Sequence, residues 1–374
     1  MYDVIIAGAG IGGATAAYFL SRQGLKVLVV ERKKLPRYKP CGGAVPVAVL
    51  DFFPFSLEPV IEQRITAVTY FFQGTKMLTV PFPASVVMVM RDKLDYFVLE
   101  QAGAEVWENQ RIIEVQEDTK RVTVLTERGD KLHGHYLIAA DGANSVVARS
   151  LGLRRKKAFG VALEVEIPAS DALLDAYNSR ACFFFGTVKS GYEWIFPKKE
   201  KLSVGIGTLE RTGENLKALL MKDMARQGLP LDGLPLKAHP LPVYRGRQLL
   251  HTQRTMLIGD AAGLMDPVSG EGIRYAVHSA RIATEVILNE SIHTYTRRVQ
   301  REIGTHLSKA RIWAWAFHHH PHASFELGVR NPYLTPDFAR MYEGRLSYGG
   351  MLLRIPLYLG GMVQRLECEE RISE

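Results

Sequence analysis

Apolar residues along the chain form short continuous runs, each followed by a glycine-rich or helical stretch. The run from Tyr2 to Ala7 is almost entirely apolar, as expected for a strand buried on both faces of a sheet. A helical pattern from Ala14 to Arg22 follows it, and similar runs at 26–30, 136–140 and 255–258 predict further strands. Strands separated by helices in this order predict an α/β protein with a doubly wound sheet.

Other segments alternate apolar and polar residues, which is typical of strands that expose one face. Val68, Tyr70 and Phe72 alternate in a predicted hairpin, residues 61–83, that turns at Gln73-Gly74. Further strands rich in aromatic and β-branched residues are expected at 159–167, 179–187, 192–196 and 202–209. We therefore expect a large antiparallel sheet with the predicted helix 216–226 on one face.

Two glycine motifs far apart in the sequence indicate the ligand of the parallel sheet. Gly8, Gly10, Gly12 and Gly13 lie between the first strand and its helix, where glycines let a pyrophosphate approach the helix N-terminus. Gly259-Asp260 follows the last strand, and Gly270, Gly272 and Ile273 lead into another helix, which suits a ribityl chain and a second phosphate. Together the two motifs predict FAD.

Three polar residues complete the predicted cofactor site. Glu31 ends the second strand, where its carboxylate can accept hydrogen bonds from a ribose diol. Arg91 begins a predicted helix and can lie beside the cofactor phosphates, although a surface arginine at a helix start is an equal alternative. Asp141, before Gly142, follows a strand and begins a second strand-turn-helix crossing.

The order of these segments predicts a discontinuous domain organisation. A Rossmann-type FAD-binding domain is interrupted by an inserted antiparallel-sheet substrate domain and followed by a helical C-terminal region. The FAD-binding domain comprises 1–60, 84–157 and 251–290, the sheet domain 61–83 and 158–250, and the helical region 291–374.

Composition narrows the class of partner. The net charge of +8 and pI of about 9.3 favour an anionic partner, but the basic residues are dispersed without a recognition motif, which argues against nucleic acid. Three widely spaced cysteines, Cys41, Cys182 and Cys368, predict neither a disulfide framework nor a zinc site. We expect a cytoplasmic protein without a signal peptide or spanning helix, and a location at the membrane surface is compatible with this expectation. The histidines of 318–322 lack metal-ligand spacing and are interpreted as a helix end.

The ordered set of the first glycine motif, Arg91, Asp141-Gly142 and Gly259-Asp260 resembles the p-hydroxybenzoate hydroxylase-like flavoproteins. Two segments resemble the geranylgeranyl reductase family within that group: 38–43 fits its Y-x-x-C-x-G element, and 192–197 fits its Y-x-W-x-F-P element. The resemblance implies that Cys41 lies near the flavin. The full set of expected cofactor-binding residues is Gly8, Gly10, Gly12, Gly13, Glu31, Arg32, Cys41, Gly42, Ala44, Arg91, Asp141, Gly259, Asp260, Gly270, Gly272 and Ile273.

The activity that this resemblance implies is hydrogenation of isoprenoid carbon-carbon double bonds by reduced FAD. Hydride delivery to an isolated alkene needs a matched proton, for which Cys41 is the first candidate and Tyr192 the second. Tyr192 and Trp194 lie two apart on one strand, so both are expected on the wall of the substrate pocket. A flavin monooxygenase or halogenase is the alternative. NADPH, NADH or a ferredoxin-like protein is expected as the transient reductant, and an isoprenoid lipid as the substrate.

Overall fold

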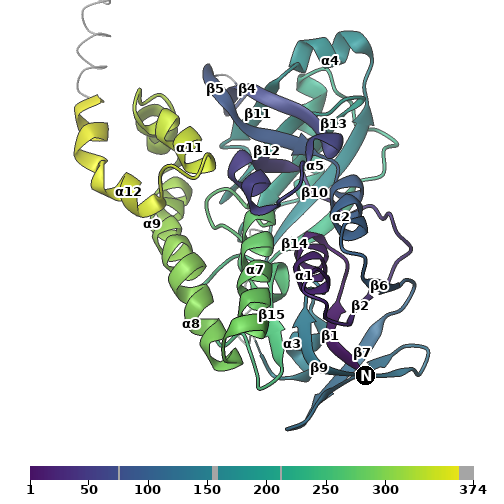
Figure 1. Ribbon diagram of the computed structural model, residues 1–374. Coiled ribbons are helices and arrows are strands. Elements are labelled where there is room, and N and C mark those ends of the chain that lie inside the picture. Colours follow the sequence, from purple (N-terminus) through teal and green to yellow (C-terminus); the bar gives the residue numbers. More distant parts are fainter. Residues whose placement is uncertain (75, 154–158, 211–212, 362–374) are drawn as a thin grey trace, which may run out of the picture.

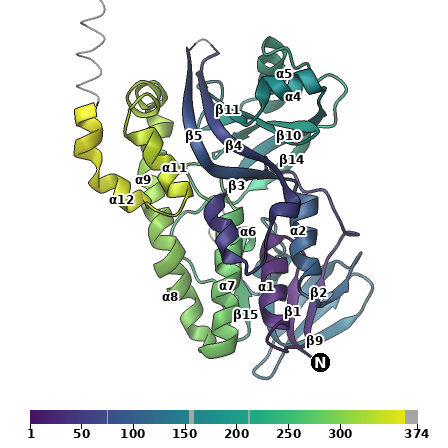
Figure 2. The ribbon, with the colours of Figure 1, turned by 45° about the horizontal axis from the view of Figure 1, so that its top comes forward.

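Two β-sheets and a C-terminal group of helices make up the fold, as the computed structural model in Figure 1 shows. The structure describes residues 1–74, 76–153, 159–210 and 213–361. The first sheet lies at the end of the molecule that carries the N-terminus, the second sheet lies at the opposite end, and the C-terminal helices run along one side (Figures 1 and 2). This arrangement confirms the predicted fold class.

The first sheet is the predicted Rossmann-type sheet. Its strand order is β6-β2-β1-β9-β8-β7, and β15 also pairs with β9. Parallel pairing joins β1 to β2 and β9, β2 to β6, and β9 to β15. The strands are β1 (Tyr2–Ala7), β2 (Val27–Val30), β6 (Glu105–Trp107), β7 (Ile112–Glu117), β8 (Val122–Thr126), β9 (Lys131–Ala139) and β15 (Thr255–Leu257).

Helices cover this sheet and bury its apolar strands. Val4, Ile5 and Ile6 of β1 have no exposed surface, which explains the continuous apolar run in the sequence. Helix α1 lies between α2 and α7 in the packed layer. The helices of this half are α1 (Ile11–Ser21), α2 (Arg91–Glu100), α3 (Val146–Ser150), α6 (Gly259–Ala262) and α7 (Ile273–Asn289).

The second sheet contains eight strands in the order β14-β10-β13-β12-β11-β4-β5-β3 within the described residues. Most neighbours are antiparallel, as expected, but β11 runs parallel to β4. The strands are β3 (Ala44–Pro46), β4 (Ile61–Phe72), β5 (Lys76–Val89), β10 (Gly160–Pro168), β11 (Arg180–Phe185), β12 (Gly191–Pro197), β13 (Lys201–Thr208) and β14 (Lys237–Leu241).

One face of the second sheet carries its own hydrophobic core. Leu216, Leu220 and Met224 of α5 (Leu216–Arg226) pack against Ile195 and Val204 of the sheet. Helix α4 (Asp171–Tyr177) lies on the same side of the molecule (Figure 1). The predicted bounds of α5 agree with the structure residue for residue. The face of the second sheet opposite α5 remains available to line cavities.

The predicted hairpin is observed, whereas two segments assigned to the FAD-binding domain pair with the second sheet. The β4–β5 hairpin turns where predicted, with Gln73 and Gly74 both at positive φ, of 49° and 70°. However, β3 and the end of β5 belong to the second sheet, so residues 44–46 and 84–89 leave the part of the chain that the sequence assigned to FAD binding. The reason is backbone pairing between β3 and β5, which apolarity alone does not reveal.

The C-terminal region is helical within the described residues, as predicted. Its helices are α8 (Tyr295–Val299), α9 (Thr305–His319), α10 (Pro321–Ala323), α11 (Leu334–Tyr342) and α12 (Tyr348–Leu353). Helix α9 ends at His319 and α10 begins at Pro321, which confirms the histidine segment as a helix end. In the described part of the chain no helix combines the length and apolarity needed to cross a bilayer.

Candidate cofactor and substrate site

The first glycine motif forms a close-packed turn at the start of α1. Gly8 has φ of 99°, and a Cβ added there would lie 2.6 Å from the carbonyl oxygen of Ala140. A Cβ added at Gly13 would lie 2.0 Å from the carbonyl oxygen of Gly8. Gly10 and Gly12 line a cavity beside the helix N-terminus. Because only glycine fits the close approach, phosphate oxygens can reach the backbone N–H groups there, so the turn fits the pyrophosphate of FAD.

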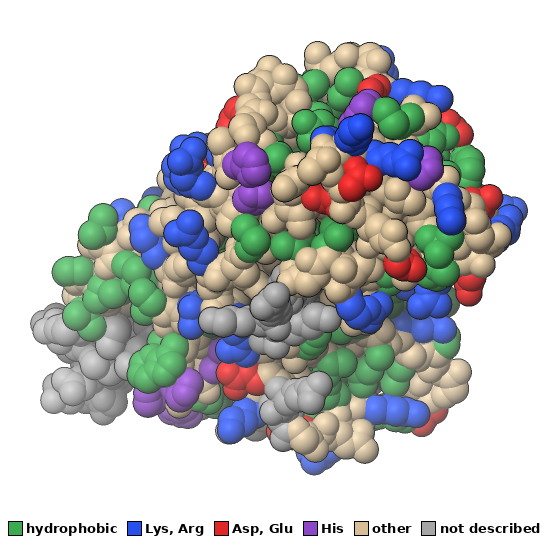
Figure 3. Space-filling view, turned by 90° about the horizontal axis from the view of Figure 1, so that it is seen from below, with side chains coloured by type: hydrophobic (Ala, Val, Ile, Leu, Met, Phe, Trp, Pro, Cys, Tyr) green, Lys and Arg blue, Asp and Glu red, His purple; other side chains and the backbone are tan. Residues whose placement is uncertain are grey.

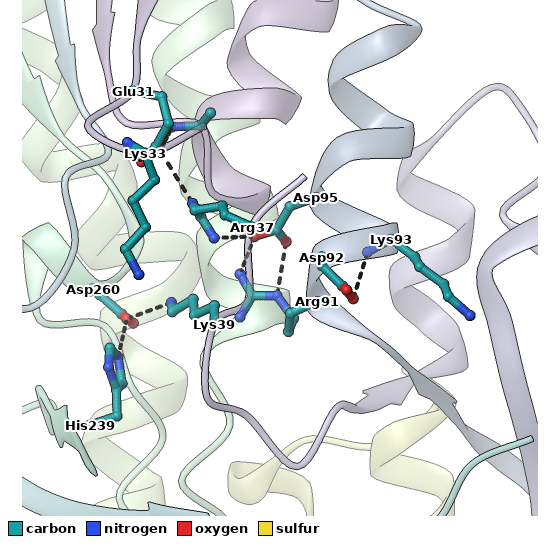
Figure 4. Close-up of polar contacts among 11 residues, drawn as sticks. Glu31, Lys33, Arg37, Lys39, Arg91, Asp92, Lys93, Asp95, His239 and Asp260 are labelled. Carbon is teal, nitrogen blue, oxygen red and sulfur yellow. Dashed lines mark hydrogen bonds and ion pairs between the residues drawn. The ribbon is translucent and has the colours of Figure 1, made fainter. Parts of the chain in front are cut away.

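Glu31 lies directly behind this turn. Its Oε2 accepts a hydrogen bond from the Ala9 N–H at 2.9 Å, and its Oε1 accepts one from the Lys33 N–H at 3.1 Å. The Nε atom of Arg37 lies 3.3 Å from the same carboxylate (Figure 4). The adjacent Arg32, also predicted to bind the cofactor, is exposed. Arg37, which the sequence reasoning missed, therefore covers the acidic end of β2.

Arg91 is buried and tied to Asp95 one helical turn further along α2. Its Nε and Nη2 atoms donate to the two Asp95 oxygens at 2.8 and 2.9 Å. Cys41 lines the same cavity as Arg91, and its sulfur accepts a hydrogen bond from the Gly43 N–H at 3.4 Å. Burial opposes the charge of Arg91, but Asp95 and Cys41 outweigh it and raise its pKa. Arg91 lines the same cavity as Gly10, so it is a permanently charged group on the predicted cofactor path.

Asp260 provides a second charged contact across the cavity. Its Oδ2 lies 3.3 Å from Lys39 Nζ and 3.9 Å from His239 Nε2 (Figure 4). Burial alone would raise the pKa of this carboxyl, but Lys39 and His239 lower it below its usual value. Asp260 is therefore a carboxylate. The sequence reasoning missed Lys39 and His239, because the loop that carries Lys39 and the strand β14 that carries His239 meet Asp260 only in the folded chain.

The Cys41-Gly42-Gly43 segment lies against the second sheet. A Cβ on Gly42 would lie 2.9 Å from the Phe196 ring, and Gly43 has φ of 75°. Lys198, buried at the end of β12, donates from Nζ to the Gly42 carbonyl oxygen at 2.6 Å and to the Val89 carbonyl oxygen at 2.8 Å. Lys198 directly follows the aromatic motif but was not predicted as part of the site. It fixes the position of the segment that carries Cys41.

The predicted aromatic residues do lie on one sheet face. Tyr192 donates its hydroxyl hydrogen to the Ser269 carbonyl oxygen, and burial together with the nearby acid Asp266 raises its pKa. Trp194 Nε1 donates to Ser203 Oγ at 3.4 Å. Trp194 borders only the cofactor-side cavity, whereas Tyr192 borders that cavity and the larger one. The expectation that both form the substrate wall therefore fits Tyr192 better than Trp194.

The second, larger cavity has a volume of about 520 Å³ and lies between the second sheet and the C-terminal helices. Its walls are mainly aromatic and aliphatic, including Val68, Tyr70, Phe82, Phe183, Phe185 and Phe338. Residues that line both cavities mark the place where they meet. These are Cys41, Gly42, Tyr192, Phe196, Gly270, Gly272 and Ile273.

Three other residues predicted to bind the cofactor differ in which cavity they line. Gly259 lines the cofactor-side cavity beside Asp260. Ala44, predicted to bind the cofactor, lines only the larger cavity. Asp141 does not line either cavity: its Oδ2 accepts hydrogen bonds from the N–H groups of Val146 and Val147 at the start of α3. Its neighbour Gly142 does line the cofactor-side cavity.

The glycine turn and the Gly259 loop line one cavity, with the acidic end of β2 behind the turn, and this arrangement is that of an FAD-dependent oxidoreductase. Family models agree: an FAD binding domain matches residues 62–288, and an FAD dependent oxidoreductase matches residues 3–39. The chain is 30% identical to the chloroplastic geranylgeranyl diphosphate reductase of Arabidopsis thaliana, over 77% of this chain and 66% of that protein. It is also 30% identical to the menaquinone reductase of Mycolicibacterium smegmatis, over 79% of this chain and 78% of that protein.

Solved structures share the fold. A geranylgeranyl bacteriochlorophyll reductase-like protein from Thermoplasma acidophilum matches with a TM-score of 0.74 and 22% identity, covering 85% of this chain and 87% of that one. A flavin-dependent brominase matches with a TM-score of 0.72 and 18% identity, covering 92% and 93%. The chain belongs to the geranylgeranyl reductase family of FAD-dependent oxidoreductases. The predicted family, enzyme class and cofactor FAD are thereby confirmed.

Proposed function

We propose that this protein hydrogenates carbon-carbon double bonds in the isoprenoid chain of a lipid. The observation that carries the proposal is the apolar cavity of about 520 Å³ that meets the cofactor-side cavity at Cys41 and Tyr192. A cavity with aromatic and aliphatic walls suits a hydrocarbon chain and excludes water from it. The reductase names of the two relatives, which concern geranylgeranyl diphosphate and menaquinone, support an isoprenoid substrate.

Reduced FAD supplies the hydride in this proposal, and the chain's own residues supply the rest. The second hydrogen must arrive as a proton on the neighbouring carbon. Cys41 lies at the junction of the cavities, which Arg91 also approaches from the cofactor side, and the Cys41 sulfur accepts a hydrogen bond from the Gly43 N–H at 3.4 Å. The Tyr192 hydroxyl is already donated to Ser269, so Cys41 is the first proton donor and Tyr192 holds the Gly270 loop.

The lipid substrate implies contact with a membrane surface. Exposed apolar side chains gather on α9, α12 and the residues that follow: Ile312, Trp315, Leu353, Ile355, Leu357 and Leu359. Figure 3 shows apolar side chains at the edge of the molecule where these helices lie, with basic side chains dispersed nearby. Phe317, His318 and Pro321 of the same region line the larger cavity. A lipid can therefore enter from this side, while NADPH, NADH or a ferredoxin-like protein reduces the cofactor.

An anaerobic assay tests the proposed function. Holoprotein reduced with dithionite and mixed with a polyprenyl lipid in detergent should reoxidise its flavin, and mass spectrometry should find a product heavier by two hydrogens for each double bond reduced. Oxygen should be unnecessary, because the alkene accepts the electrons. Reoxidation that requires oxygen, with a product that gains oxygen or a halogen, would contradict the proposal and favour the monooxygenase or halogenase alternative.

A further inference from the structure

The loop 266–272, between helices α6 and α7, lies where the two cavities meet. Gly270 and Gly272 line both cavities, and Val268 and Glu271 line the larger one. The loop, all of whose residues are described, belongs to no helix or strand, so contacts with other parts of the chain must fix its conformation. Those contacts decide the shape of the wall that the cofactor-side cavity presents to FAD.

Asp266 connects this loop to two side chains outside it. The residue is 1% exposed, and its Oδ1 accepts hydrogen bonds from the N–H groups of Val268 and Ser269 at 2.8 and 3.2 Å. Two tyrosine hydroxyls also donate to this carboxyl: Tyr275 to Oδ2 at 3.0 Å and Tyr348 to Oδ1 at 3.2 Å. Burial raises the pKa of both phenols well above the ordinary value, so both hydroxyl hydrogens remain available as donors.

The two tyrosines reach Asp266 from different parts of the chain. Tyr275 belongs to α7, which directly follows the loop, so it is a local partner. Tyr348 begins α12, 82 residues away along the sequence, and has no exposed surface. Its ring packs on His306 of α9 with ring centroids 4.7 Å apart, and its carbonyl oxygen accepts a hydrogen bond from Trp313 Nε1 at 3.4 Å. Tyr348 is thus fixed by α9 and connects the C-terminal helices to the loop.

The second sheet holds the same loop. Tyr192 of β12 donates its hydroxyl hydrogen to the Ser269 carbonyl oxygen. Figures 1 and 2 show α7 between α1, which follows the glycine turn, and α9, on which Tyr348 packs. The loop therefore joins the second sheet, a helix of the FAD-binding half and the C-terminal helices, and it cannot shift relative to the cavities without breaking at least one of these bonds.

We propose that Tyr348 is a positioning residue for FAD, which acts through Asp266 on the loop that carries Gly270 and Gly272. Neither Tyr348 nor Asp266 is among the described residues that line the two cavities, so the effect reaches the cofactor through the loop. Because the loop and α12 share this hydrogen bond, FAD binding should order α12, and the position of α12 should in turn set the affinity for FAD. This coupling concerns the cofactor alone, so it goes beyond the proposed function and holds for any reaction of the flavin.

A matched pair of variants tests the coupling. Tyr348→Phe removes the hydroxyl and keeps the ring. Tyr358→Phe is the control, since Tyr358 is 5% exposed, lies in the same region and donates to the buried acid Asp337 at 2.7 Å. Fluorescence titration of the apoprotein with FAD measures the dissociation constant. Tyr348→Phe should raise this constant about fivefold or more, the lower end of typical couplings between two sites, whereas Tyr358→Phe should stay within about twofold of wild type.

Amide hydrogen exchange separates positioning from plain stabilisation. In wild type, saturating FAD should slow exchange at 348–353 as well as at the glycine turn, 8–13. In Tyr348→Phe, saturating FAD should still protect the glycine turn, but its protection of 348–353 should fall severalfold. A merely structural hydroxyl would speed exchange equally with and without FAD and would leave the FAD-dependent difference unchanged.

Two results would overturn the inference. One is wild-type FAD affinity, or wild-type protection of 348–353 by FAD, in Tyr348→Phe. The other needs no variant: it is a wild-type protein in which saturating FAD protects the glycine turn but leaves exchange at 348–353 unchanged. Neither measurement uses a lipid, so a failure of the proposed reductase activity leaves this test intact.

Discussion

Cys41 illustrates how a single residue acquires its chemistry from residues far away in the sequence. It follows Pro40 in an irregular segment, but Lys198, directly after β12, donates to the carbonyl oxygen of the next residue, Gly42, and Arg91 of α2 lines the same cavity. A cysteine buried among apolar residues would instead be inert, as expected of Cys182, whose pKa burial raises to about 11. Cys41 and Cys182 therefore have different surroundings, because Cys41 is only partly buried and lines both cavities, whereas Cys182 is buried in the second sheet.

This difference leads to a direct test of Cys41. Cys41→Ser should bind FAD as wild type does, because the glycine turn and Asp260 are untouched, but its flavin should be reoxidised by a polyprenyl lipid about 10²- to 10⁴-fold more slowly. Cys182→Ala is the matched control and should keep the wild-type rate. Stopped-flow absorbance of the flavin measures both variants. Product formation at the wild-type rate by Cys41→Ser would assign this cysteine a structural role only.

At the scale of elements, two glycines of β13 make room for the Trp194 side chain of the neighbouring strand β12. Gly205 and Gly207 lie opposite Trp194 and Tyr192, and their missing side chains leave room for the Trp194 ring to lie over the sheet. The indole lines the cofactor-side cavity, and its Nε1 donates to Ser203, which donates to Glu164 on the same cavity. A strand predicted from the sequence therefore also serves, through its two glycines, as a platform for an aromatic ring.

Gly205→Ala tests this platform. The added Cβ would lie 2.2 Å from the Trp194 ring and 2.6 Å from the Leu163 carbonyl oxygen, so the indole must move. We expect a loss of about 1–3 kcal/mol in the free energy of unfolding and a shift in tryptophan fluorescence. Gly360→Ala is the control, because nothing lies within 4 Å of a Cβ there. Equal stability of the two variants would show that the Trp194 ring can move without a loss of packing.

Elements and single residues differ in how far the sequence predicts them. β1 and α5 follow from local pattern, because a strand buried on both faces and an amphipathic helix each leave a regular signature. The parallel pairing of β11 with β4 does not, since strand direction depends on a long connection. The same reason explains which site residues were not predicted. Their partners lie on other segments of the chain, and no sequence motif includes both partners; these residues are Arg37, Lys39, His239, Lys198 and Glu164. The sequence did offer one indication of such a residue: Lys198 directly follows the predicted aromatic motif.

At the scale of the whole molecule, the apolar surface and the larger cavity lie on the same side. Leu353 and Leu359 are 85% and 54% exposed, and α9, beside α12, contributes Phe317 to the cavity wall. Water-exposed leucines in such a group are costly unless another apolar phase covers them. Together with the net charge of +8, this favours an anionic lipid surface.

Vesicle sedimentation measures this association. Wild type should bind vesicles that contain phosphatidylglycerol more tightly than neutral vesicles, and salt should weaken the binding because exposed charges are screened. Leu353→Glu combined with Leu359→Glu should reduce the bound fraction severalfold. Ile113→Glu is the control, since Ile113 is 47% exposed on β7 of the first sheet, away from α12 (Figure 1). Equal loss of binding by the control would locate the lipid contact elsewhere.

The position of β15 in the first sheet has a consequence for how the chain folds during synthesis. β9 pairs with β1 on one side, and on the other side with β8 through residues 131–134 and with β15 through residues 137–139. The end of β9 therefore lacks a neighbour on this side until the strand near residue 255 has been made. During translation the part of β9 that pairs with β15 stays open while strands β10 to β14 of the second sheet emerge from the ribosome. Sequence-distant pairing of this kind slows folding and exposes backbone to aggregation. The nascent protein should therefore depend on chaperones until its last parallel strand has docked.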